Sequence, residues 1–415
     1  MARVFENDKS LMKNIAIINT CNFGSTGKIG VSLLDNFRKR GYNAYFFYGR
    51  VRNNDTCENA FLFEGKVEAK LHVVLGKIFG LSDYFSPIAT YRLISMLRQR
   101  DIDTIYMISP HGFYLNENIF YDYIVKDGIH LVYAMIDEYS YLGKCAYEPK
   151  CEKYKTCHGK CPDKKKYPAS LTFDTCSLFL KRKARNYQRA TPLFVGPQFL
   201  LDRSAHAYLR QFMTMKPVDL GIDLSMYCPR NARDLRSELG IQTNQKVILF
   251  VGSKLKGSQA FTQMAQAFRD NDEYVFIHVG YREPTTDGLP SNYKPIPFVK
   301  DDSDVALYYS LADLLVYPSM ADTMSNTCLE ALACGTPILI FNISGMPYLI
   351  DETVGIIVPP GDVDALVEVV KQTPQKSQKL IETCRSYAEK RYDNNLYIDK
   401  LIQYTLEDEK RFDKI

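Results

Sequence analysis

Residues Val316–Ile340, VYPSMADTMSNTCLEALACGTPILI, form the stretch that decides the fold. The apolar run that opens it stops at a Pro-Ser pair, and a polar loop leads into a predicted helix over Thr327–Cys334. A second apolar run follows. Ser325 or Asn326 would cap this helix at its start and Gly335 would end it. The order strand, helix, strand predicts a βαβ unit and therefore a parallel sheet.

Two carboxylates, Asp322 and Glu330, stand on either side of the predicted helix start. The first turn of a helix receives a diphosphate through its free N–H groups and its macrodipole. A carboxylate one turn further in accepts the hydroxyls of a ribose. We therefore expect a nucleotide-diphosphate site with Glu330 on the ribose, built from the residues at the helix start: Met324, Ser325, Asn326 and Thr327.

A second loop with phosphate-binding character reads Gly252-Ser-Lys-Leu-Lys-Gly257 and follows a predicted strand. Its glycines allow close backbone approach, and Lys254 and Lys256 would pair with phosphate oxygens. The motif is weak alone. It gains weight because it and the stretch above both follow strands, and ligands of parallel sheets bind at the carboxyl ends of strands.

Strand-like and helix-like runs alternate through most of the 415 residues, which predicts α/β architecture with parallel sheets. The length and two separate series predict two doubly wound domains: a first domain over 1–216 with a Cys/Lys-rich insertion at about 140–190, and a nucleotide-binding domain over 217–392. A helix over 393–415 is expected to pack back on the first domain. Strands are expected at Ile15–Asn19, Ala44–Tyr48, Thr104–Ile108, Leu131–Met135, Pro192–Gly196, Val247–Val251, Tyr274–Val279, Leu314–Tyr317 and Ile356–Val358, and one helix runs from the fifth of these to about Met213.

The loop CNFGSTGKIG, Cys21–Gly30, joins the first predicted strand to its helix. It is not a Walker A loop, because Asn22 and Ile29 replace the required Gly and Ser/Thr. It is either an ordinary tight turn or a ligand loop. As a ligand loop it would act on the acceptor side through Gly24, Ser25, Thr26, Gly27 and Lys28.

Two further polar positions follow strand ends in the first half of the chain, His111 and Asp137. Both are candidates for acceptor contacts, although an isolated histidine is more often structural. The run Leu71–Leu81, LHVVLGKIFGL, has an apolar helical stripe. We expect a buried core helix there, and the alternative is a helix that lies on a membrane.

The basic charge of this chain is concentrated in one segment. Residues 144–189 hold 13 Lys/Arg against 4 Asp/Glu, or +9, in a chain of net charge +4. The segment is either a solvated insertion or a contact for an anionic partner such as a membrane surface, a diphosphate lipid or nucleic acid. No transmembrane run and no signal peptide are evident, so a cytoplasmic protein with reduced cysteines is expected.

Four cysteines lie close together in this segment: Cys145, Cys151, Cys157 and Cys161. Structural zinc, two disulfides and free thiols are the three alternatives, and His158 would be able to replace one ligand. A catalytic zinc is not expected, because four Cys ligands leave no open coordination position.

With these residues identified, the chain resembles glycosyltransferase family 4, the retaining nucleotide-sugar enzymes of GT-B fold, over nearly its whole length. The residues that carry the resemblance are Asp322 and Glu330 with ALACGTPI, then NISGMPYLID and GIIVPPGD, the pair Lys256-Gly257, and Gly221-Ile-Asp223. The stretch from His111 through the Cys/Lys-rich segment is similar to a bacterial surface-polysaccharide branch of that family.

The resemblance implies two domains that face a central cleft and a UDP- or GDP-sugar donor. Asp322, Glu330 and Lys256 would be the catalytic residues, with Lys254 and Lys256 stabilising the leaving diphosphate. No metal would be required for catalysis. The acceptor would be a glycan or a lipid-diphosphate-linked glycan at the inner membrane face, and no nucleic acid would be bound.

Three positions depart from the family pattern: Asp322 replaces the usual Glu, Ile136 replaces the His before Asp137, and Ile108 replaces another frequent His. The main expectation is a retaining glycosyltransferase of polysaccharide assembly. The alternatives are an inactive nucleotide-sugar-binding scaffold and a GT-B nucleotide-sugar epimerase. Binding without turnover distinguishes the first alternative, and donor conversion without acceptor distinguishes the second.

Overall fold

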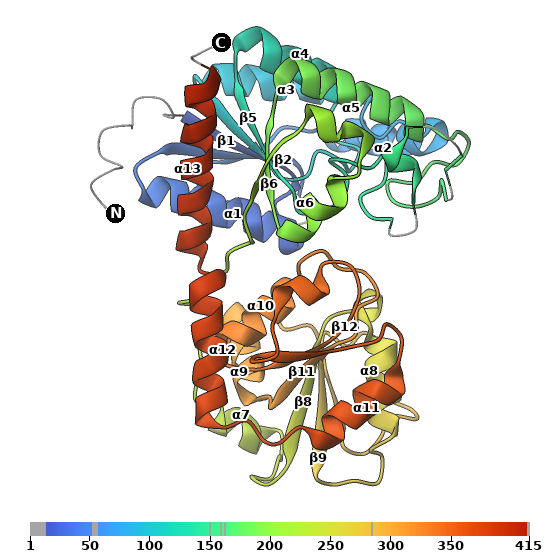
Figure 1. Cartoon of the computed structure of the whole chain (residues 1–415), viewed down its shortest axis with the longest axis vertical. Helices are drawn as coiled ribbons and strands as arrows, with labels where there is room; N and C mark the ends of the chain where they lie inside the picture. The colour runs from blue at the N-terminus through green and yellow to red at the C-terminus, as the bar shows by residue number, and fades with distance from the viewer. Residues whose placement is uncertain are drawn as a thin grey trace. The chain divides into compact units, whose positions relative to one another are not determined.

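The computed structural model describes residues 14–51, 57–148, 151–157, 160–161, 163–283 and 285–412. The chain divides into two compact units. Unit 1 runs up to Val218 and resumes at Ile398, and unit 2 is Asp219–Tyr397. Each unit contains one parallel sheet with helices on both faces (Figure 1). The two-domain α/β fold predicted from the sequence is therefore confirmed.

The sheet of unit 1 has seven parallel strands in the order β3-β2-β1-β4-β5-β6-β7. Their bounds are β1 Asn14–Cys21, β2 Asn43–Arg50, β3 Ala60–Leu62, β4 Thr104–Met107, β5 His130–Ala134, β6 Leu193–Gly196 and β7 Thr214–Pro217. The central strands are buried on both faces, as expected where helices cover both sides.

The helices of unit 1 are α1 Gly24–Lys39, α2 Lys66–Phe79, α3 Pro87–Arg98, α4 Glu117–Asp127, α5 Cys176–Ala190 and α6 Gln198–Ser204, with 3-10 turns η1 Lys153–Lys155 and η2 Tyr208–Phe212. Helices α3, α4 and α5 cover one face of the sheet, and α1 covers the other (Figure 1). The single helix predicted up to Met213 is wrong. The chain there forms α6 and then η2, because Ala205–Ala207 leaves the helical path between them.

The sheet of unit 2 has six parallel strands in the order β10-β9-β8-β11-β12-β13. They are β8 Lys246–Val251, β9 Tyr274–Val279, β10 Tyr293–Ile296, β11 Leu314–Tyr317, β12 Ile338–Phe341 and β13 Gly355–Val358. The helices are α7 Arg233–Glu238, α8 Ser258–Gln266, α9 Asp302–Leu311, α10 Asn326–Ala333, α11 Val363–Gln372 and α12 Gln378–Arg391, with 3-10 turns η3 Lys254–Lys256 and η4 Met346–Leu349.

The strand order reverses direction once in each sheet. In unit 1 the reversal lies between β1 and β4, and in unit 2 it lies between β8 and β11. The loops after such a pair of strands lead to opposite faces of the sheet, so a crevice opens between them that binds ligands in doubly wound folds. The two motifs chosen from the sequence of unit 2, after β8 and after β11, lie on either side of its reversal.

Helix α13, Asn394–Phe412, packs against the sheet of unit 1 through its later turns, as predicted. The hydroxyl groups of Tyr106 on β4 and Thr405 lie 2.7 Å apart in the core. His130, at the start of β5, points its Nε2 at Asp408 (3.0 Å) and its Nδ1 at Glu409 (3.5 Å). A buried polar bond and an ion pair therefore attach this helix to the unit.

Helix α2 contradicts the expectation of a buried core helix over Leu71–Leu81. Only His72 and Gly76 of α2 are buried. The apolar stripe at i, i+4, i+7 and i+11 faces outward, with exposed fractions of 81% for Val67 and 55% for Leu71. The amphipathic pattern was correctly recognised, but its apolar side is the exposed one. No helix of the described residues is both long enough and apolar enough to span a membrane.

The pH dependence of stability tests the attachment of α13. Burial opposes protonation of His130, but the carboxylates of Asp408 and Glu409 outweigh it and raise the pKa above its ordinary 6.5. The folded state therefore holds this proton more tightly than the unfolded state. Its stabilising effect is complete at pH values below about 6.5 and is lost as the pH rises through the folded-state pKa.

We expect His130→Gln to reduce the fall in melting temperature between about pH 6 and about pH 8. His206→Gln, at an exposed histidine of the same unit, is the control and should leave that fall unchanged. An identical pH profile for wild type and His130→Gln would contradict the assignment.

Candidate functional site

The loops after β8 and β11 are joined by an ion pair. Lys256 Nζ lies 2.7 Å from Asp322 Oδ2, and the Tyr317 hydroxyl donates to the same oxygen at 2.9 Å. Burial and the Asp322 charge raise the pKa of Tyr317 well above its usual range, so Tyr317 remains a donor. Two residues selected separately from the sequence, Lys256 and Asp322, thus form one contact. The Lys256 side chain is 40% exposed at the end of the sheet, where it is accessible to an anion.

A glycine allows these loops to meet. Gly257 has φ +101°, and a Cβ atom there would lie 2.2 Å from the carbonyl oxygen of Pro318. His278 fixes the position of Gly252, because its Nε2 lies 3.2 Å from the Gly252 carbonyl oxygen. The other ring nitrogen of His278, Nδ1, lies 2.8 Å from the Tyr293 hydroxyl. The backbone around Lys256 is therefore held on both sides. Lys254 of the same loop is exposed.

Helix α10 supplies the other half of this site. Its N-cap residue is Ser325, but the Ser325 hydroxyl makes no capping bond to a helix N–H among the described residues. Asn326 and Thr327 are partly exposed in the first turn. Met324 is instead part of the packing, because it is 8% exposed and its sulfur lies 3.4 Å from the Leu220 nitrogen.

Glu330 lies one turn into α10, partly exposed. The buried Tyr309 of α9 donates its hydroxyl to Glu330 Oε2 at 2.8 Å. Burial and the Glu330 charge raise the pKa of Tyr309 well above its usual range, so this bond orients the carboxylate at all ordinary pH values. A cation, a glycine-rich loop, a helix start and an oriented carboxylate together match the needs of a bound nucleoside diphosphate.

The loop after β1 is a tight turn in which α1 begins at Gly24. A Cβ at Gly27 would lie 2.4 Å from the backbone carbon of Asn22, so only glycine fits there. Asn19 Nδ2 donates to the Thr26 hydroxyl at 3.2 Å, which gives Thr26 a role in the turn. Gly24, Ser25 and Lys28 are exposed.

His111 and Asp137 form a pair in unit 1. His111 Nε2 lies 2.6 Å from Asp137 Oδ2 and 2.9 Å from the Ser109 hydroxyl. Asp137 is itself positioned by the Tyr139 backbone N–H, at 2.9 Å. Among the described residues, the buried His111 Nδ1 has no hydrogen-bond partner. An oriented imidazole with one unused nitrogen is suited to bind a hydroxyl group.

Several contributing residues were not selected from the sequence. Tyr309 and Tyr317 belong to apolar runs, where a hydroxyl group is not recognisable as functional. Tyr167 of the Cys/Lys-rich segment packs its ring 5.5 Å from the His111 ring, a contact between residues 56 positions apart that no spacing reveals. The sequence offered one signal for such residues: polar side chains that follow neighbouring strands of a parallel sheet lie close together. Ser109, which follows β4, could have been selected in this way.

Of the four cysteines grouped by their spacing, Cys145, Cys151 and Cys161 line one small cavity and Cys157 does not. Cys157 points away from the others, with its sulfur 3.8 Å from the Ser177 carbonyl oxygen. Cys176, at the start of α5 and 15 residues beyond Cys161, lies among the rest instead. All the described cysteines are free thiols. His158 lies outside the described residues.

Two glycine substitutions test the close approach of the loops in unit 2. Gly257→Ala combines positive φ with a backbone clash, whereas Gly361→Ala has φ +78° and no atom within 4 Å of its new Cβ. The control should cost about 1 kcal/mol of unfolding free energy from the backbone alone. Gly257→Ala should cost roughly 1–3 kcal/mol more, measured by denaturant unfolding. Equal costs would contradict the contact.

Comparison with known proteins gives a family match in unit 2. A family model described as glycosyl transferases group 1 matches residues 245–375, which include both loops and α10. A D-inositol 3-phosphate glycosyltransferase of Segniliparus rotundus is 28% identical over 172 residues, 36% of this chain and 38% of that protein. The putative teichuronic acid biosynthesis glycosyltransferase TuaC of Bacillus subtilis is 24% identical over 178 residues, 40% and 45% of the two chains. The match thus spans less than half the length of these relatives.

Solved structures resemble the chain over nearly all its length. Sucrose-phosphate synthase from Thermosynechococcus elongatus has a TM-score of 0.69 at 16% identity and covers 94% of this chain and 98% of its own. Anabaena Alr3699/HepE in complex with UDP-glucose has a TM-score of 0.65 at 16% identity, covering 95% and 99%. At these identities the structures establish the fold. They show that the chain has the two-domain GT-B fold, and the group 1 model matches residues 245–375 within unit 2.

Proposed function

We propose that this protein is a retaining glycosyltransferase that moves a sugar from a UDP- or GDP-sugar to a glycan or lipid-linked acceptor in polysaccharide assembly. The observation that carries the proposal is the grouping of Lys256, Asp322 and Glu330 at the strand-order reversal of unit 2. The similar HepE structures contain UDP, UDP-glucose, or UDP and glucose, which supports a nucleotide-sugar donor.

On the donor side, Lys256 and the first turn of α10 would bind the diphosphate, with Lys254 as a second cation. Glu330, oriented by Tyr309, would accept the ribose hydroxyls. Charge grows on the diphosphate as the bond to the sugar breaks, and a fixed ammonium stabilises that charge more in the transition state than in the ground state. Because a lysine and helix N–H groups fill this role, transfer would need no metal ion.

The acceptor hydroxyl would attack the anomeric carbon from the face that the diphosphate leaves. The new C–O bond forms, the sugar–phosphate bond breaks, and a phosphate oxygen takes the hydroxyl proton. The configuration at the anomeric carbon is thereby retained. The pair of His111 and Asp137 would bind an acceptor hydroxyl through His111 Nδ1, with Ser109 and Tyr139 keeping the pair in place.

Helix α2 supports an acceptor held at a membrane surface. Its exposed apolar stripe is extended by neighbouring exposed apolar side chains, because the Leu171 N–H bonds to the Lys77 carbonyl oxygen and brings Leu171 and Phe173 beside the helix end. Lys66, Lys70 and Lys77 belong to the same helix, and Lys164 donates to the Thr172 carbonyl oxygen next to Leu171. Exposed apolar side chains with lysines nearby fit the interface of an anionic bilayer. The proposed location is therefore the inner face of the cell membrane.

The role of Glu330 is tested by substitution to alanine. Loss of a charged hydrogen-bond acceptor costs about 1.5–3 kcal/mol, so Glu330→Ala should weaken UDP or GDP binding about 10- to 100-fold in calorimetry. Glu368→Ala, the same change on α11 of the same unit, is the control and should bind as wild type. Unchanged affinity in Glu330→Ala would contradict the proposed site.

An activity assay distinguishes the proposed transferase from the two alternative functions. Wild-type protein incubated with nucleotide sugars and lipid-linked glycan acceptors should form a glycosylated product and release nucleoside diphosphate. Binding without any turnover would instead establish a nucleotide-sugar-binding scaffold. Conversion of the donor sugar without acceptor would establish an epimerase.

Membrane contact is tested with vesicles. Replacing Leu71 and Val74 by serine removes two exposed apolar side chains of α2, each worth roughly 1 kcal/mol or more when buried. The double variant should bind phosphatidylglycerol vesicles at least about tenfold more weakly than wild type in sedimentation. Serine at Ile356 and Ile357, two exposed side chains of unit 2, is the matched control. Equal binding of all three proteins would exclude α2 as the contact.

A further inference from the structure

Four thiols from separate parts of unit 1 surround one small cavity. Cys145 follows β5, Cys151 and Cys161 belong to the Cys/Lys-rich segment, and Cys176 opens α5. Cys145 and Cys176 are buried, and the other two are partly exposed. The cavity has a volume of about 10 Å³, so it holds one atom and not a cluster of several.

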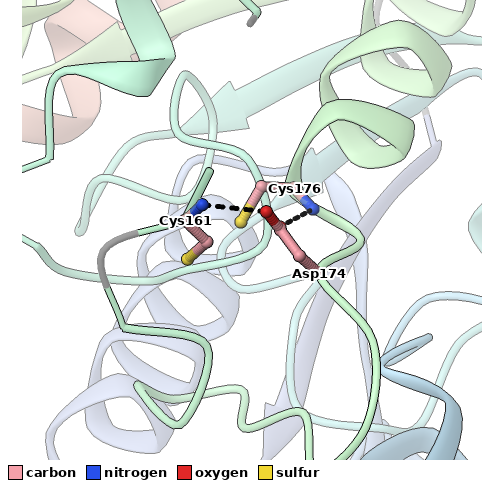
Figure 2. Close-up of side chains that lie close together, drawn as sticks. All are labelled: Cys161, Asp174 and Cys176. Carbon is pink, nitrogen blue, oxygen red and sulfur yellow. Dashed lines mark hydrogen bonds between the residues drawn. The ribbon is translucent and has the colours of Figure 1, made fainter. Parts of the chain in front are cut away.

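Two of these sulfur atoms lie as close together as the ligands of one metal ion. The Cys176 thiol neighbours the thiols of Cys145 and Cys161 in the lining of this cavity. The ligand atoms of Cys161, Asp174 and Cys176 all lie within 4.8 Å of one another (Figure 2). Four sulfurs at about 2.3 Å from a zinc ion lie roughly 3.8 Å apart. The sulfurs of Cys161 and Cys176, within 4.8 Å of each other, approach that spacing.

Backbone N–H groups point at the sulfur atoms. Those of Lys153 and Tyr154 donate toward Cys151, two and three residues earlier, and that of Asp163 donates toward Cys161. The turns after Cys151 and Cys161 therefore direct backbone donors toward two of the sulfurs that line the cavity.

Asp174 positions two of the cysteines and is not itself a ligand. Its carboxylate accepts the backbone N–H of Cys161 at 2.8 Å and of Cys176 at 3.1 Å, as Figure 2 shows, and pairs with Lys153 at 3.0 Å. Both carboxylate oxygens are thus engaged. The thiols remain as the ligand set.

Positive charge beside the thiols offsets a charged metal site. Lys144 is buried next to Cys145, with its ammonium on the carbonyl oxygens of Lys164, Lys166 and Pro168. Lys183 of α5 is buried on the carbonyl oxygens of Tyr139, Leu142 and Gly143. A zinc ion with four thiolates carries a net charge of −2, and two buried ammonium groups close to it reduce the cost of its burial.

We propose that Cys145, Cys151, Cys161 and Cys176 bind a single zinc ion as a closed tetrathiolate site, and that Cys157 takes no part. Because all four positions are filled by sulfur, the site is structural. It ties the Cys/Lys-rich segment to the end of β5 and to the start of α5. The same segment places Tyr167 against His111, so the metal would hold one wall of the proposed acceptor site.

Metal analysis of the purified full-length chain tests the ligand set. Wild type reconstituted with Zn²⁺ and desalted should retain one zinc per chain. Cys176→Ser should lose the ion, whereas Cys157→Ser should retain it as wild type does. Cys157 is buried and belongs to the same sequence cluster, so it is a matched control. Retention of zinc by Cys176→Ser, or equal loss from both variants, would overturn the proposed set.

A measurement on wild type covers the case in which Cys176→Ser does not fold. Native zinc-loaded protein is titrated with a thiol reagent before and after the metal is removed with a chelator. Removal should expose four additional reactive thiols and lower the melting temperature, and re-added Zn²⁺ should reverse both effects. Wild type that retains no zinc after reconstitution would overturn the proposal. So would the visible absorbance of an iron–sulfur chromophore.

Discussion

The ion pair between Lys256 and Asp322 joins the loops that end β8 and β11, and the geometry of the candidate site in unit 2 depends on it. These strands flank the reversal of strand order, so their loops would diverge to opposite faces of the sheet. Gly257 lets the backbones touch at Pro318, and the ion pair then fixes the lysine ammonium at the opening. The cation is oriented before any ligand arrives, which lowers the entropic cost of binding and the reorganisation needed for catalysis.

Unit 1 also brings two polar side chains together beside its reversal of strand order, but the side chains are different ones. Its polar residues also lie after β4 and β5, next to the reversal, but a histidine and a carboxylate meet there instead of a lysine and a carboxylate. Ile136 stands directly before Asp137, where the family resemblance of the sequence predicts a histidine. The structure places the imidazole of His111 against Asp137 from the neighbouring strand end.

The sequence was most informative where local chemistry decides the structure. Strands β9 and β11 have the bounds predicted from the sequence, and α10 begins and ends one residue earlier than predicted. Apolar runs and turn residues mark these elements clearly. Long-range contacts were not accessible in this way. The exposure of α2 depends on which side of an amphipathic helix finds a partner, and an apolar stripe alone gives no answer.

The cysteine cluster shows the same limit. Spacing selected Cys157 because it is near the others in sequence, but the chain turns so that its side chain faces Ser177. Cys176 was overlooked because a helix start 15 residues further on comes back to the cluster only in three dimensions. At the proposed donor site the tyrosines that orient Asp322 and Glu330 lie within apolar elements, so only the carboxylates themselves were recognisable.

The central claim is that a nucleoside diphosphate binds between the loops that follow β8 and β11. Hydrogen exchange of the full chain with and without UDP or GDP tests it most directly, since bound phosphate should protect the backbone N–H groups it contacts. We predict slower exchange at 252–257 and 319–327 with one of these nucleotides. Unchanged exchange in both segments with both nucleotides, or protection confined to unit 1, would contradict the account.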